Sequence, residues 1–328
     1  MKNISIILTG GICILYILKA SISLGQGKSE GVKTEILEAV QKKYGLNSGK
    51  PLTQRVERTP DDVIKMFREA GMSPTEHQLT KEEVSIVASA FAVLPPLHQQ
   101  VLKQHLKSIS FLDNMPNTAL TSPITDKENV NLYHITFRAG ILHQTISDWV
   151  TEKERKCFTA DPSISVTIQA GLLNALTYVL LHEGTHVVDG SIRLISADTI
   201  AGKPQMNAFT RDFSKGVWSN INSHSWPFTD SIVVKSIFRP GGHRYLPAEA
   251  IQIYSELTHT PFVSLYSTAS WHEDLAELVT VYHLTKILRQ PFRIQIEKEG
   301  KVLQHFEPMR SASVQKRLRL LQQFYDKG

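Results

Sequence analysis

The stretch YVLLHEGTHVVDG, residues 178–190, places two histidines and a glutamate inside a strongly apolar run. Burying imidazoles and a carboxylate is costly unless something binds them. If the run is helical, His182 and His186 lie one turn apart on the same face, with Glu183 beside them. This H-E-x-x-H spacing lets both rings reach one ion, and it is typical of zinc hydrolases. The motif therefore predicts a helix that binds one zinc ion per chain.

The residues around the motif predict a strand that leads into a buried helix. Residues 163–169 alternate as a strand does, and Gly171 follows them. Gly190 stands where a glycine at the end of a helix is expected. We therefore expect the helix to end there. Apolar residues recur at helical spacing before the motif: Leu172, Leu173, Leu176, Val179 and Leu180.

A catalytic zinc site needs a third protein ligand. Asp189 is a poor candidate because it lies about 10 Å along the helix from His182 and has a short side chain. We expect it to support a ligand or to serve as a polar group at the helix end. A second helix is predicted from Trp271, with Glu273 and Glu277 four residues apart on one face. An ordinary solvated acidic face is the alternative, but beside H-E-x-x-H we predict Glu273 as the third ligand and Glu277 as the partner of a ligand histidine.

Together these segments resemble the gluzincin branch of zinc peptidases that contains anthrax lethal factor and the Mlc titration factor A peptidases. That branch carries H-E-x-x-H-x-x-D, present here from His182 to Asp189, and a tyrosine seven residues before the glutamate of an E-x-x-A-E segment, here Tyr266 and Glu273. The resemblance implies a zincin-like α+β fold. It also implies that His182, His186 and Glu273 bind zinc, that Glu183 is the base and that Tyr266 assists. Trp271 and His272 depart from the family pattern, and they leave the substrate open.

The expected chemistry is peptide-bond hydrolysis. Zinc lowers the pKa of its bound water to about 7. Glu183 would accept that water's proton and pass it to the leaving amine. Tyr266 is the preferred donor to the developing oxyanion, and His243, in a glycine-rich loop, is the alternative. Two rival functions stay open: a catalytically decayed zincin-fold protein that binds zinc or a partner, and hydrolysis of a non-peptide amide.

The N-terminal segment and the net charge predict where the protein is located and which partners it binds. Residues 1–23 read as a cleavable signal peptide, which predicts a secreted or periplasmic protein without a membrane partner; an uncleaved anchor is the alternative. Cleavage removes Lys2 and Lys19 and no acid, so the net charge falls from +5 to +3. This mild, scattered excess argues against a nucleic-acid partner and leaves a peptide or protein as substrate. The oligomeric state stays open.

The mature chain would keep one cysteine, Cys157, so no internal disulfide is possible. We expect Cys157 to be a small buried hydrophobic residue.

Residues 24–107 are predicted to form a helical N-terminal region that serves as a scaffold or docks substrate. Helices are expected at 32–44 and 60–68, and Thr80 with Glu83 forms a capping box before a third. The histidines of this region are expected at the surface rather than as ligands: His77, His98 and His105.

Residues 108–328 are predicted to form the zincin-like catalytic domain. Strands at 108–113, 131–140 and 163–169 would form one small sheet beside the motif helix, and an extended substrate would pair with its edge strand. The aromatic-rich insertion 191–260 forms either a satellite core or a lid over the cleft. A hairpin turning at Glu299–Gly300 and a packing helix at 314–325 complete the chain.

Overall fold

The computed structural model describes residues 30–128, 130–200 and 203–326. The predicted signal peptide, residues 1–23, lies outside the described residues. The chain mixes helices and strands, which confirms the α+β class. The helices are α1 (Glu30–Lys43), α2 (Asp61–Glu69), α3 (Lys81–Ala92), α4 (Pro96–His105), α5 (Ile146–Arg155), α6 (Ala175–Ile192), α7 (Ala208–Ser214), α8 (Ala250–Leu257), α9 (Trp271–Tyr282) and α10 (Ala312–Arg317).

The strands form four sheets, two of which are hairpins. They are β1 (Thr75–Glu76), β2 (Leu106–Asp113), β3 (Ala119–Thr125), β4 (Asn131–Arg138), β5 (Ile164–Gln169), β6 (Ala197–Ile200), β7 (Lys203–Met206), β8 (Trp218–Asn220), β9 (Ser223–His224), β10 (Arg293–Lys298) and β11 (Lys301–Phe306). The larger sheets run β1-β2-β4-β3 and β11-β10-β5.

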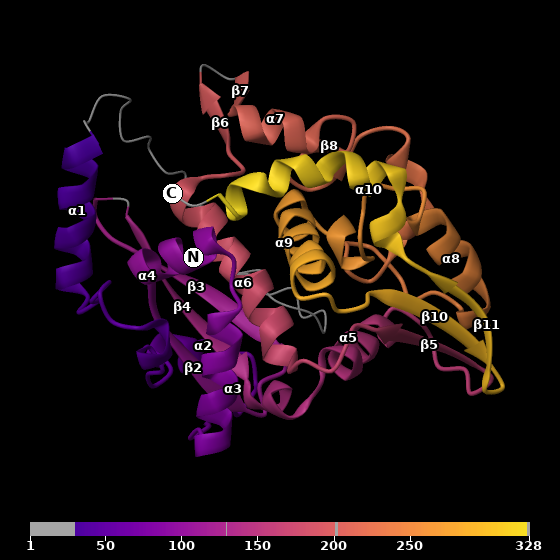
Figure 1. Ribbon diagram of the computed structural model, residues 1–328, viewed down its shortest axis with the longest axis horizontal. Helices are drawn as coiled ribbons and strands as arrows, with labels where there is room; N and C mark the ends of the chain where they lie inside the picture. Colours follow the sequence, from indigo (N-terminus) through magenta and orange to yellow (C-terminus); the bar gives the residue numbers. More distant parts are fainter. Residues whose placement is uncertain (1–29, 129, 201–202, 327–328) are drawn as a thin grey trace.

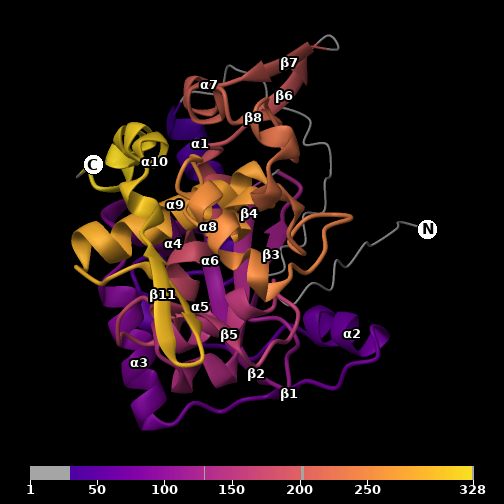
Figure 2. The ribbon, with the colours of Figure 1, turned by 90° about the vertical axis from the view of Figure 1, so that its right-hand side faces the viewer.

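Helices α6 and α9 pack side by side in the centre, with the two larger sheets on opposite sides of them (Figure 1). One face of the four-stranded sheet turns toward α6, and its residues Ile109, Ile135 and Phe137 join the main apolar core. The other face packs on α2, where Val63 and Phe67 meet Leu120, and α2 lies beyond that sheet in Figure 2. This arrangement sets β3 beside the motif helix.

The prediction of one sheet from three strands is wrong for β5. Strands β2 and β4 pair with each other in parallel, but β5 pairs with β10 in the other sheet. Residues Ile164–Gln169 do form a strand, as their alternating pattern predicts, but alternation does not identify a pairing partner, and this partner lies more than a hundred residues away. The hairpin is confirmed: Glu299 and Gly300 form the turn, both with positive φ.

The outer edge of β5 is covered by side chains of α5 rather than by another strand. Thr151 bonds both the N–H and the C=O of Ile168, and the Ser147 hydroxyl accepts the N–H of Ala170. The Arg155 guanidinium donates to the carbonyl of Val166 at 3.0 Å. These three residues are spaced one turn apart on α5, so one helix face satisfies the backbone that an edge strand leaves unpaired.

The bounds of the helices agree with most of the local predictions. The helix at 32–44, the helix at 60–68 and the Thr80–Glu83 capping box are confirmed within one or two residues. The end of the motif helix at Gly190 is wrong: α6 continues to Ile192, and Arg193 adopts the left-handed conformation at its end. Gly190 is needed for another reason, since an added Cβ there would lie 2.2 Å from the Tyr133 hydroxyl.

The apolar run before the motif and the C-terminal helix need smaller corrections. Leu172 and Leu173 are exposed and precede α6, because Asn174 caps that helix. The predicted helix at 314–325 is α10 followed by a tighter 3-10 helix, Leu318–Phe324, with Val314 and Leu321 buried. The expectation for the cysteine is confirmed, because Cys157 is free and buried.

The insertion 191–260 contributes aromatic side chains to the main core, so a separate satellite core is wrong. Five of its rings belong to that core: Phe213, Trp218, Phe238, Tyr245 and Tyr254. Trp226, in contrast, has 82% of its surface exposed. The β6–β7 hairpin projects at the top of Figures 1 and 2.

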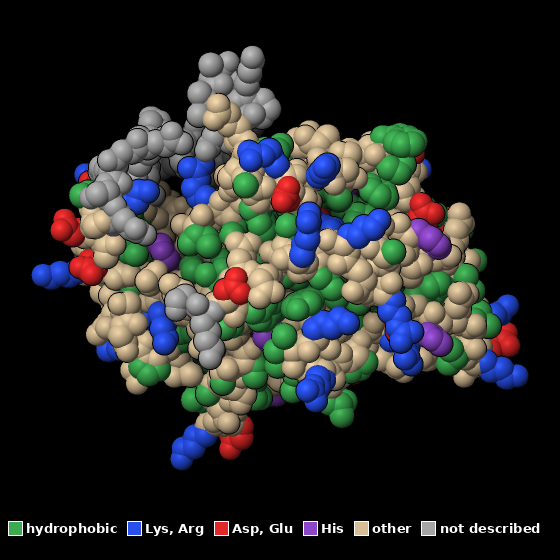
Figure 3. Space-filling model, turned by 45° about the horizontal axis from the view of Figure 1, so that its top comes forward, with side chains coloured by type: hydrophobic (Ala, Val, Ile, Leu, Met, Phe, Trp, Pro, Cys, Tyr) green, Lys and Arg blue, Asp and Glu red, His purple; other side chains and the backbone are tan. Residues whose placement is uncertain are grey.

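Charge and hydropathy add two observations. On the face drawn in Figure 3, the Lys and Arg side chains are spread out rather than gathered into one stripe. Among the described helices, none is by itself long and apolar enough to cross a membrane; α3 and α4, bent by 117°, meet that test only as a pair.

Candidate metal centre

The motif helix α6 is buried along most of its length, including all three motif side chains. His182 and Glu183 have no exposed surface, and His186 has 4%. The back of α6 is held by α4: an added Cβ at Gly184 would lie 2.9 Å from the His98 ring, and His98 Nε2 lies 3.0 Å from the Thr185 hydroxyl. Close packing on this side fixes the face that the motif histidines present to α9.

Two imidazoles and one carboxylate converge between α6 and α9. Glu273 Oε2 lies 2.9 Å from His182 Nε2 and 3.5 Å from His186 Nε2. The two Nε2 atoms are 3.1 Å apart, and one candidate ligand atom from each of the three residues lies within 4.8 Å of the others. Two nitrogens and a carboxylate oxygen form a donor set that zinc accepts. The residues therefore fit a metal ion.

Glu277 supports the cluster from one turn further along α9. Its Oε1 lies 3.0 Å from His182 Nδ1, on the far side of the ring from Glu273. A carboxylate there orients the imidazole and leaves Nε2 as the nitrogen that can bind a metal. Glu277 also accepts bonds from Tyr178 at 2.9 Å and from Ser264 at 2.6 Å, and Lys153 Nζ lies 3.3 Å away.

Glu183 is held by a residue of β3. The Thr121 hydroxyl donates to Oε2 of Glu183, and Oε1 has no hydrogen-bond partner among the described residues. Burial raises the pKa of Glu183 to about 7, against the opposing effects of the His182 charge and the Thr121 bond. A carboxylate with one oxygen anchored and a pKa near neutrality suits a general base.

The field at the cluster favours positive charge. Burial alone would lower the pKa of His182, but its hydrogen bonds to Glu273 and Glu277 and their charges raise it to about 9. Burial works against Glu273 as well, yet the two histidines hold its pKa well below the usual range. Burial outweighs the Glu273 carboxylate at the other ring and lowers the pKa of His186. The carboxylates that favour the protonated form of His182 also favour a cation beside it.

The hydrogen bonds of Asp189 lie at the end of α6 rather than at the three converging residues. Asp189 accepts the N–H of Ile195 at 2.7 Å and pairs with His272 Nδ1. Of the two roles that the sequence left open, the polar group at the helix end matches these contacts. Asp189 also brings His272, from α9, against the end of α6.

The two candidate oxyanion donors differ in position. The Tyr266 ring is buried, with its centroid 5.7 Å from that of His182 and 4.0 Å from Lys153 Nζ. His243 is exposed, and its ring lies 5.3 Å from that of Tyr245, away from the cluster contacts. Tyr266 is therefore the candidate that the fold brings to the cluster.

Sequence reasoning missed Thr121 and Lys153 and misjudged His98. Thr121 and Lys153 reach the site from β3 and α5, and no local spacing links them to α6 or α9. His98 was expected at the surface, but it is fully buried, and burial lowers its pKa to about 3. His98 lies on α4 and contacts Thr185 of α6, and this contact arises only from the packing of the two helices.

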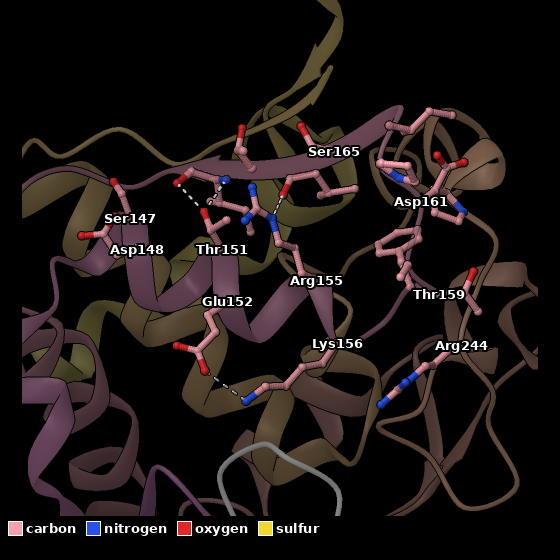
Figure 4. A pocket seen from close by; sticks show the side chains of 18 residues that line it. Ser147, Asp148, Thr151, Glu152, Arg155, Lys156, Thr159, Asp161, Ser165 and Arg244 are labelled. Atoms are coloured by element: carbon pink, nitrogen blue, oxygen red, sulfur yellow. Dashed lines mark hydrogen bonds and ion pairs between the residues drawn. The ribbon is translucent and has the colours of Figure 1, made fainter. Parts of the chain in front are cut away.

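A cavity of about 1130 Å³ is lined by residues of α5 and β5 (Figure 4). Its lining includes Thr151, Arg155 and Arg244, and none of the converging residues. The cavity is therefore separate from the cluster of His182, His186 and Glu273.

Comparison with protein-family models, with curated proteins and with solved structures gave no match.

Proposed function

We propose that this chain is an exported zinc-dependent metallopeptidase with a zincin-like fold, in which His182, His186 and Glu273 bind one zinc ion. The convergence of these three side chains, with Glu183 beside them, carries the proposal. The resemblance to the lethal factor and Mlc titration factor A group supports the same ligand set. Export with removal of residues 1–23 belongs to the proposal as well.

The residues of this chain would divide the work of hydrolysis. When bound, zinc supplies Lewis acidity and brings the pKa of a coordinated water to about 7. Glu183 would take the proton of the attacking water through its unpartnered oxygen and deliver it to the leaving amine. Glu277 would hold the His182 ring in place, and Tyr266 would donate to the oxyanion.

An extended peptide would reach this centre along β3. This strand ends the four-stranded sheet, runs antiparallel to β4 and carries the residue that bonds Glu183. Main-chain pairing with such an edge aligns a peptide without selecting its side chains. Peptides and unfolded protein segments are therefore the proposed substrates.

The test combines metal analysis with peptide cleavage by the protein lacking residues 1–23. We expect about one zinc per chain and cleavage of members of a broad peptide library. Glu183→Gln should keep zinc and the melting temperature but lose at least about 100-fold in kcat, because only the basic carboxylate is removed. Glu256→Gln, an exposed change on α8, is the matched control and should behave as wild type.

Two results would redirect the proposal. Zinc binding without any cleavage would favour the decayed, zinc-binding protein. Near-normal turnover by Glu183→Gln would refute the assigned base.

A further inference from the structure

The alternation of β3 determines which way each of its residues faces. The Thr121 side chain reaches Glu183 on α6, whereas that of Leu120 packs on the opposite face with Val63 and Phe67 of α2. Successive strand residues alternate between faces. Residues 119, 121, 123 and 125 therefore turn their side chains toward the motif helix.

The main chain of β3 alternates as well, between groups that bond β4 and groups that point outward. The Arg138 N–H donates to the carbonyl of Thr118 at 2.8 Å, so residue 118 faces β4. In an antiparallel pair, the N–H and C=O of one residue point to the same side and those of the next residue to the other. Thr121 and Pro123 therefore direct their main chains away from β4.

Pro123 agrees with this assignment. A proline within a paired strand is tolerated where the missing N–H would have pointed away from its neighbour. It also limits the outer edge, because residue 123 can accept a hydrogen bond there but cannot donate one. Thr121 can do both. A second strand could thus exchange two main-chain bonds with Thr121 but not with Pro123.

We infer that Thr121 is a positioning residue that links substrate pairing to the general base. Thr121 itself is buried, with 3% of its surface exposed, and β3 becomes more exposed toward Thr125. An extended peptide entering from that end would pair with the outward N–H and C=O of Thr121, while the Thr121 hydroxyl holds Oε2 of Glu183 and leaves Oε1 for the attacking water. One residue thereby fixes the peptide and the base relative to each other, at the place where small displacements cost most rate. This inference rests on the proposed peptidase function.

The first experiment compares Thr121→Val, which keeps the shape and removes the hydroxyl, with Thr121→Ser, which keeps the hydroxyl. On a peptide cleaved by the wild type, we expect Thr121→Val to lower kcat by about 10- to 100-fold. KM should stay nearly unchanged, because pairing uses the main chain. Thr121→Ser should restore most of kcat. Thr125→Val, on the same face of the same strand, is the matched control.

The second experiment measures binding of acetohydroxamic acid to the zinc-loaded protein by calorimetry. Its N–OH proton must leave as the hydroxamate binds, and Glu183 is placed to take it. We expect Thr121→Val to weaken this binding about 10-fold, and Thr125→Val to leave it unchanged. Circular dichroism melts would check that each variant is folded, and we expect them to be, because valine suits a strand.

The outcomes separate the two proposals. If the wild type cleaves peptides or binds the hydroxamate, and Thr121→Val matches it in kcat and affinity, the inference about Thr121 fails alone. It also fails if Thr121→Val raises KM and leaves kcat intact. A zinc-loaded wild type that neither cleaves peptides nor binds the hydroxamate overturns the proposed function, and this inference with it.

Discussion

Helix α9 buries acidic side chains on two sides and neutralises them in different ways. Toward α6, Glu273 meets the imidazoles of His182 and His186. On the other side, Asp274 accepts two bonds from Arg317, at 2.7 and 3.1 Å, and one from the Trp218 indole N–H at 2.8 Å. Neighbours in sequence thus have partners of very different kinds.

The difference separates a structural acid from one available for chemistry. A guanidinium keeps its charge at every pH that the fold survives, so the charge of Asp274 is compensated permanently. The imidazoles facing Glu273 become cationic only by gaining a proton. Asp274 is complete without any ligand, whereas Glu273 and its histidines form a set that a dication would complete.

The largest effect on the free energy of unfolding should come from breaking the ion pair between Arg317 and Asp274. Arg317→Met would leave Asp274 charged and buried without its cation, and would also remove a bond to the carbonyl of Pro261. We expect a loss of about 3–5 kcal/mol in the free energy of unfolding, measured by urea denaturation.

The matched control is Arg310→Met, whose side chain is 83% exposed while it pairs with Glu307. Exposed pairs contribute little, so its stability should change by less than about 1 kcal/mol. Equal losses for the two variants would show that Asp274 does not depend on Arg317.

On the side of α9 that faces α6, Glu273→Gln removes a zinc ligand and should therefore weaken zinc affinity by at least about 100-fold. Competition with a chromophoric chelator measures this affinity. The metal-free variant should melt below the metal-free wild type, because its neutral side chain no longer balances the charge on His182. Added zinc should then raise the melting temperature of the wild type and of the Glu256→Gln control, but not that of the variant. Full zinc content in Glu273→Gln would remove that residue from the ligand set.

Glu154 sharpens the comparison, because this buried carboxyl on α5 is bonded by a neutral group, the Tyr254 hydroxyl at 2.7 Å. Burial raises its pKa from 4.5 to about 7. Since the folded pKa is the higher one, the stability that the protonated group contributes is fully present below pH 4.5 and is lost as the pH rises to about 7.

Glu154→Gln stays neutral, so its stability relative to the wild type should increase by about 1–3 kcal/mol between pH 4.5 and 7.5. Urea denaturation at several pH values measures this difference. The exposed Glu152→Gln on the same helix should show no such trend. If the stability difference between Glu154→Gln and the wild type does not change with pH, then burial does not raise the pKa of Glu154 above 4.5 in the folded protein.

The sequence predicted the part of the site that depends on local spacing. Four-residue intervals brought His182 and His186 together on α6 and Glu273 and Glu277 together on α9, because helix geometry alone sets those distances. The capping box at Thr80 and the turn at Glu299–Gly300 were predictable for the same reason.

Contacts set by tertiary packing could not be predicted. Thr121 bonds Glu183 across 62 positions, and Lys153 reaches Glu277 across 124. The partner strand of β5, the burial of His98 and the Arg317 that balances Asp274 depend on elements far away in the chain. Periodicity shows that a face is buried, but not what it is buried against.

The α5 residues that cover β5 also bear on how this protein behaves among other copies of itself. An uncovered strand edge is a template on which another chain can add a strand, the first step toward aggregates and fibrils. With Ser147, Thr151 and Arg155 occupying its backbone groups, β5 offers an incoming chain few bonds to form. Growth of the β11-β10-β5 sheet is thereby blocked at β5 within the fold itself, even when the protein is concentrated.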